Sequence, residues 1–151
     1  MKIAIVNWQS VLESYTNPYT RHANILKNKY EELGHEVINI THNTDKLSLH
    51  NLIANSSDYD VIQFELPCVK LVDKLQSKLN HINGANCVAH IHEFTAFNDQ
   101  VKQETIEIAS RCKAIIVSNI TEKNAIQTYI NTDIPIYIIP IFPILTLNTK
   151  L

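Results

Sequence analysis

Short apolar runs, separated by longer segments with helical periodicity, constrain the fold of this chain more than any other feature. A continuous apolar run such as residues 3–6 is typical of a strand buried on both faces of a sheet. Strands of this kind are predicted at 2–7, 36–40, 60–65, 87–92, 114–117 and 136–139. Helices are predicted between them at 18–34, 47–54, 69–82, 99–111 and 122–129. Because such alternation favours parallel pairing, we expect a Rossmann-like α/β/α domain of three layers with a mainly parallel sheet of about six strands.

The composition excludes several classes of function. Only two glycines, Gly34 and Gly84, occur among 151 residues, so the chain has no Gly-rich loop of the kind that cradles phosphates. Thirteen basic residues stand against fifteen acidic ones, for a net charge of -2, so we expect no nucleic-acid partner. The length predicts one domain over residues 1–151.

The cysteines and the N-terminus bear on location. Cys68, Cys87 and Cys112 are too widely spaced for a metal knuckle or a disulfide framework, which favours reduced thiols in the cytoplasm. Residues 1–7 have too short an apolar run for a signal peptide. The apolar run at 134–147 is broken by prolines and is too short to span a bilayer. A cytoplasmic location is therefore expected, with a peripheral membrane location left open.

The end of the fourth predicted strand carries the strongest candidates for chemistry. His90 and His92 are two residues apart, so both point to the same face of the sheet. Histidine titrates near neutral pH, which makes His92 a candidate catalytic residue, with Glu93 to orient it or to bind a hydroxyl. The alternative is that both histidines are structural polar residues beneath a loop. A zinc site would need a third strong ligand that the sequence does not reveal, so no metal site is predicted.

Ligands of parallel α/β sheets bind at the carboxyl ends of the strands, and the other substrate-binding candidates come from there. They are Asn7, Trp8, Gln9, Tyr15, Glu65, His90, Ser118 and Thr121. Three of them have a structural alternative of their own: Trp8 as a cap over the sheet end, Glu65 as a solvated rim residue, and Ser118 as the N-cap of the next helix.

Six stretches, taken in order, resemble a known family. They are residues 1–6, 33–37 (LGHEV), 59–62, 88–92, 112–118 and 138–140. In this order and spacing the chain resembles, over nearly its whole length, the N-terminal domain of a family-4-type glycosyltransferase with the GT-B fold. The resemblance implies that His92 lies in the cleft of such an enzyme, near the transferred sugar.

The same resemblance implies a function and partners. The chain would be the acceptor-binding half of an enzyme that transfers a sugar from a nucleotide-sugar co-substrate, with no cofactor bound tightly. Its acceptor would be a glycan, a lipid or another sugar acceptor, and its partner a C-terminal donor-binding domain or a separate subunit. Two departures are a glycine-free loop at 7–17 and the sequence Pro-Ile-Phe-Pro at 140–143. The donor half is absent from the sequence, so we expect the isolated chain to be inactive.

Two further interpretations stay open at this stage. One is a non-catalytic binding or scaffold module with a degenerate GT-B-like domain, and the other is a small α/β hydrolase, which the absence of a GxSxG motif disfavours. Residues 140–151 are interpreted as an apolar tail or as the start of an interdomain linker. An uncovered apolar tail also predicts a homo-oligomer formed through it.

Overall fold

The computed structural model describes residues 1–7, 18–41, 52, 55–66, 86–130 and 133–140. Its strands are β1 (Lys2–Asn7), β2 (Glu36–Thr41), β3 (Val61–Leu66), β4 (Cys87–Ile91), β5 (Ala114–Val117) and β6 (Ile136–Ile138). Its α-helices are α1 (Pro18–Glu32), α4 (Asp99–Ala109) and α5 (Ile120–Gln127), and the 3-10 helices are η2 (Ser56–Asp58) and η5 (Phe94–Ala96). All six predicted strands are confirmed, with ends that match or shift by one residue. The predicted helix at 69–82 lies outside the described residues, and of the predicted helix at 47–54 only residue 52 is described.

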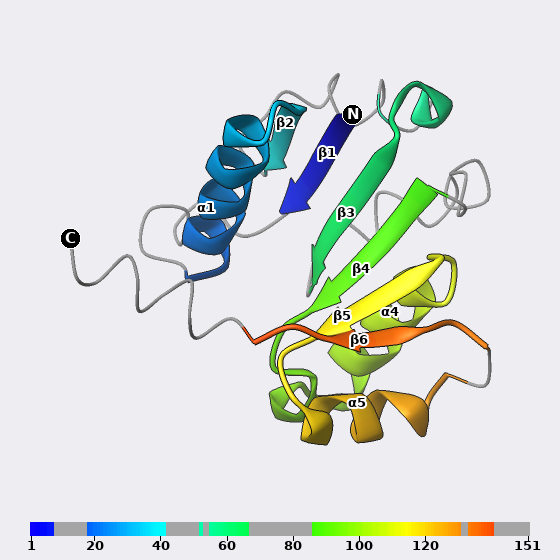
Figure 1. Ribbon diagram of the computed structural model, residues 1–151. Coiled ribbons are helices and arrows are strands. Elements are labelled where there is room, and N and C mark those ends of the chain that lie inside the picture. Colours follow the sequence, from blue (N-terminus) through cyan, green and yellow to red (C-terminus); the bar gives the residue numbers. More distant parts are fainter. Residues whose placement is uncertain (8–17, 42–51, 53–54, 67–85, 131–132, 141–151) are drawn as a thin grey trace.

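The strands form one six-stranded sheet in the order β2-β1-β3-β4-β5-β6 (Figure 1). Every neighbouring pair is parallel. The chain steps from β1 outward to β2, returns to β3 on the other side of β1, and then continues in one direction to β6. The point where the order reverses therefore lies between β1 and β3, and open α/β sheets bind ligands at the carboxyl ends of the strands beside such a point.

Helices cover both faces of this sheet. Successive residues of a strand point to opposite faces, so each strand contributes side chains to two separate cores. Ile3 and Ile5 pack with Ala23 of α1 on one face. Ala4 and Val6 belong to the larger core on the other face, together with residues of α4 and α5. The expected three-layer α/β/α architecture is thus confirmed, and α1 is the helix that covers the first face among the parts of the chain that the structure describes.

Side-chain caps define where the later helices begin. The Asn98 side chain accepts a hydrogen bond from the Val101 amide at 2.9 Å, and the Asn119 side chain accepts one from the Glu122 amide at 3.0 Å. The hypothesis that Ser118 caps α5 is therefore wrong by one residue. Asparagine and serine are comparable N-caps, so two adjacent candidates could not be separated by residue type.

The remaining expectations concern the termini and the membrane. Of the predicted tail at 140–151, only Pro140 belongs to the described residues. Cys87 and Cys112 are buried, whereas Cys68 lies outside the described residues. In the described parts of the chain, every helix is too short or too polar to cross a membrane.

Candidate metal centre

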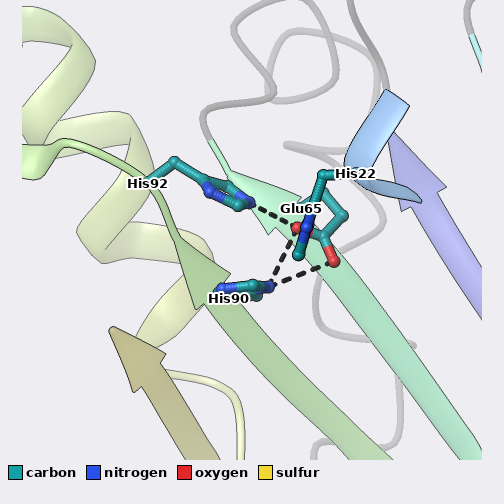
Figure 2. A group of neighbouring side chains, drawn as sticks. All are labelled: His22, Glu65, His90 and His92. Carbon is teal, nitrogen blue, oxygen red and sulfur yellow. Dashed lines mark hydrogen bonds and ion pairs between the residues drawn. The ribbon is translucent and has the colours of Figure 1, made fainter. Parts of the chain in front are cut away.

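Four side chains that can ligate a metal meet on the sheet face covered by α1. They are His22 of α1, Glu65 of β3, His90 of β4 and His92, which follows β4 directly (Figure 2). Each offers one ligand atom, and these atoms all lie within 4.8 Å of one another. All four residues are buried, with exposed fractions between 0 and 4%. We call this group the His-Glu cluster.

The sheet register explains why three of the four residues meet. Glu65 and His90 are direct partners in the parallel pairing of β3 with β4. Their side chains point to one face, and His92 reaches the same face two residues later. The His92 amide donates to the Leu66 carbonyl at 3.0 Å, so the ladder continues one residue beyond the end of β4 and fixes the backbone of His92.

Helix α1 brings the fourth residue. It follows β1, so its first turns lie at the carboxyl end of the sheet, and His22 lies near that end of the helix. The His22 ring centroid is 5.0 Å from that of His90 and 5.2 Å from that of His92, both at steep interplanar angles. The His90 and His92 rings are 4.2 Å apart. Three imidazoles thus surround one carboxylate in the interior of the protein.

Glu65 is the centre of the contacts within the His-Glu cluster. Its Oε2 lies 2.5 Å from Nε2 of His92 and 3.1 Å from Nδ1 of His90, and its Oε1 lies 3.3 Å from the same His90 nitrogen. Figure 2 shows the carboxylate between the two imidazoles, with the His22 ring beside it.

Three imidazole nitrogens of the cluster remain unsatisfied. Nδ1 and Nε2 of His22 and Nε2 of His90 are buried without a hydrogen-bond partner among the described residues. Leaving such a group unpaired costs about 1–3 kcal/mol. A cation bound by Glu65 and by one nitrogen of each imidazole would offset part of that cost.

The pKa values of these groups favour the protonation states that metal ligands need. Burial lowers the pKa of His22 to about 4, although the charge of Glu65 opposes this change. Burial also lowers the pKa of His92, against the opposing hydrogen bond to Glu65. Burial alone would raise the pKa of Glu65, but the charge of His90 and the hydrogen bonds from His90 and His92 outweigh it and lower that pKa. Neutral imidazoles and an ionised carboxylate are the forms that bind a metal.

The other residues singled out from the sequence are distributed around this edge of the sheet or lie outside the described chain. Asn7 is buried at the end of β1. Glu93 is exposed and has a left-handed backbone with φ of 51°; its charge acts on His92, and Glu65 makes the 2.5 Å contact with that ring. Ser118 and Thr121 follow β5 and take no part in the described contacts of the His-Glu cluster. Trp8, Gln9 and Tyr15 lie outside the described residues.

Sequence reasoning missed His22, and with it the third imidazole of the His-Glu cluster. The available signal was its position, because a helix that follows a parallel strand begins at the carboxyl edge of the sheet. A histidine in the first turns of such a helix is therefore placed beside the strand ends.

Comparisons with known proteins give a likeness to solved structures alone. No family model matches the chain, and no curated protein matches it. Among solved structures, a flavodoxin of Streptococcus pneumoniae TIGR4, described as a novel drug target, matches with a TM-score of 0.46 and 12% identity. The match covers 85% of this chain and 94% of the flavodoxin. At this level the likeness carries no argument about activity.

These findings correct the resemblance to a GT-B glycosyltransferase. The strand order β2-β1-β3-β4-β5 is the flavodoxin-like order of doubly wound sheets. The assignment as an acceptor-binding half, the nucleotide-sugar co-substrate and the expectation of no tightly bound cofactor came with that resemblance, and they are contradicted with it. The physical reason is that stretches such as 33–37 and 112–118 mark the starts and ends of parallel strands. Many α/β sheets need such stretches, and a fold does not fix an activity.

Proposed function

We propose that this chain is a metal-binding domain that holds one divalent transition-metal ion, Zn²⁺ in the first instance, in the His-Glu cluster. The observation that carries the proposal is the convergence of three buried imidazoles and one buried carboxylate from three separate elements. Zn²⁺ holds such ligands at about 2.0–2.2 Å, which places the atoms of a tetrahedron about 3.4 Å apart. Since the four ligand atoms already lie within 4.8 Å of one another, small side-chain movements bring them to that spacing.

The donor set indicates the class of metal. Three nitrogen donors and one oxygen donor, with no thiolate, suit Zn²⁺ and its transition-metal neighbours, whereas Ca²⁺ and Mg²⁺ require mainly oxygen ligands. Four protein ligands complete a tetrahedron, which is typical of structural zinc sites rather than catalytic ones. The ion would link α1 to β3 and β4, because His22 comes from the helix whereas Glu65 and His90 come from the two strands.

The experiment is metal titration of the purified chain after it has been stripped with a chelator. We expect binding of one Zn²⁺ per chain by calorimetry, and a Co²⁺ adduct with the intense visible absorption of a tetrahedral site. His22→Ala should weaken binding by at least about 100-fold, more than the loss of an outer-shell partner costs. The matched control is His35→Ala, since His35 lies outside the cluster at the start of β2 and contacts the N-terminal amine. Equal affinities for His22→Ala and the unmodified chain would contradict the proposal.

A further inference from the structure

A chain of hydrogen bonds runs from α1 to the carboxylate of the His-Glu cluster. The Tyr30 hydroxyl donates to Oε1 of Gln63 at 3.0 Å, and Nε2 of Gln63 donates to Oε1 of Glu65 at 2.6 Å. Gln63 lies two residues before Glu65 on β3, so both side chains point to the α1 face. Gln63 is buried, and Tyr30 packs against the smaller core on this face.

Each link of this chain fixes the direction of the next. An ionised carboxylate only accepts hydrogen bonds, so the Gln63 amide must turn its nitrogen toward Glu65. Its carbonyl oxygen then faces Tyr30 and accepts from the hydroxyl. Burial, together with the charge of Glu65, raises the pKa of Tyr30, so the hydroxyl keeps the proton that it donates.

The two oxygens of Glu65 therefore have different surroundings. Oε1 accepts the 2.6 Å bond from Gln63 and lies 3.3 Å from Nδ1 of His90, whereas Oε2 makes the shorter contacts with the imidazoles, 2.5 Å to His92 and 3.1 Å to His90. A metal ion among the imidazoles would meet Oε2 on the side where the histidines gather. Because the Gln63 amide holds Oε1 at 2.6 Å, Oε2 is the oxygen that such an ion would reach.

We infer that Gln63 and Tyr30 are positioning residues of the metal site, which make Glu65 a ligand through Oε2 alone and keep the ion four-coordinate. This inference rests on the proposed function. Such outer-shell partners orient metal ligands, and their loss typically weakens metal binding by about 10–100-fold.

The test uses Co²⁺ as the probe, because its visible absorption falls when a fourfold site gains a fifth ligand. In Gln63→Met the side chain keeps its length but loses both hydrogen bonds. We expect about 10–100-fold weaker Co²⁺ binding and a weaker absorption per bound ion, since Oε1 is released to join the metal. Tyr30→Phe should change both quantities in the same direction but less, because it removes only the first link.

The matched control is Asn39→Ala, which deletes a different hydrogen bond between the sheet and α1, from Asn39 to Asn24 at 3.0 Å. This control should leave Co²⁺ affinity and absorption unchanged even if its unfolding midpoint falls. An unmodified chain that binds no Co²⁺ would overturn the proposed function, and the inference with it. Tight binding by the unmodified chain, with the same affinity and spectrum in Gln63→Met and Tyr30→Phe, would overturn the inference alone.

Discussion

Glu65 and His90 face each other across β3 and β4 as direct register partners, and Nδ1 of His90 lies 3.1 Å from Oε2 of Glu65. A buried contact between a carboxylate and an imidazole is weak evidence for stability by itself, because taking a charged group out of water is costly. Replacing Glu65 has a larger effect on stability, because His90 and His92 then lose the carboxylate that they contact.

Glu65→Gln should weaken both the fold and the metal site. The amide carries no charge and offers His90 and His92 one acceptor oxygen in place of two. We expect the free energy of unfolding of the metal-free chain to fall by about 1–3 kcal/mol, measured by guanidinium denaturation. Zn²⁺ affinity should fall by at least about 100-fold. Glu36→Gln is the control, because Glu36 is exposed at the start of β2; equal losses in the two variants would refute a special role for Glu65.

Acid should destabilise the metal-free chain in a defined pH window. The pKa of folded His22 is lowered from 6.5 to about 4, so below pH 6.5 the unfolded chain binds a proton that the folded chain rejects. The free energy of unfolding should therefore fall as the pH decreases from about 6.5 to about 4. The lowered pKa of His92 adds to the loss, and the lowered pKa of Glu65 continues it at still lower pH. Denaturation curves across this range measure the effect, and His22→Leu should make the dependence shallower; an unchanged slope in that variant would assign the dependence to other groups.

Zn²⁺ should raise the melting temperature of the chain. A ligand that binds only the folded state adds about 2.7 kcal/mol when its free concentration is 100 times its Kd. For a chain of this length, that corresponds to an increase in Tm of about 5–10 °C. Differential scanning fluorimetry with and without Zn²⁺ measures the shift, and a chelator should reverse it. Mg²⁺ at the same concentration serves as the negative control, and an equal shift with Mg²⁺ would argue against a nitrogen-rich site.

The turn after His92 contains a residue whose replacement should stabilise the protein. Glu93 has φ of 51°, a left-handed conformation that costs a non-glycine residue about 1–2 kcal/mol. Glu93→Gly should raise the free energy of unfolding by about 0.5–1 kcal/mol, after the larger entropy of unfolded glycine is subtracted. Glu93→Val should lower it, because a β-branched residue tolerates this conformation poorly. A destabilised glycine variant would mean that contacts of the Glu93 side chain outweigh the backbone strain.

The sheet was predictable because each strand is marked by its own residues. The continuous apolar run at 3–6 and the short run at 114–117 indicate buried parallel strands without knowledge of their neighbours. No local pattern in the sequence indicates the order of the strands in the sheet. The adjacency of β3 and β4, which makes Glu65 and His90 partners, depends on packing of the whole sheet.

The candidate site was only partly predictable for the same reason. Glu65, His90 and His92 were each identifiable as residues at strand ends, but their convergence on one face required the register between two strands. His22 is separated from Glu65 by more than forty positions in the sequence and is brought to it by α1. The family resemblance was wrong because its motifs report the strand ends of an α/β sheet rather than the chemistry between them.

The alternation of side chains along β3 has a consequence for how this protein can diverge in sequence. Gln63 and Glu65 point toward α1, while Ile62, Phe64 and Leu66 fill the opposite core. A single inserted or deleted residue within this strand would exchange the two sets, sending the carboxylate into the apolar layer and Phe64 among the histidines. Relatives that keep the cluster should therefore vary in the length of their connecting segments, while the spacings from 63 to 65 and from 90 to 92 stay constant.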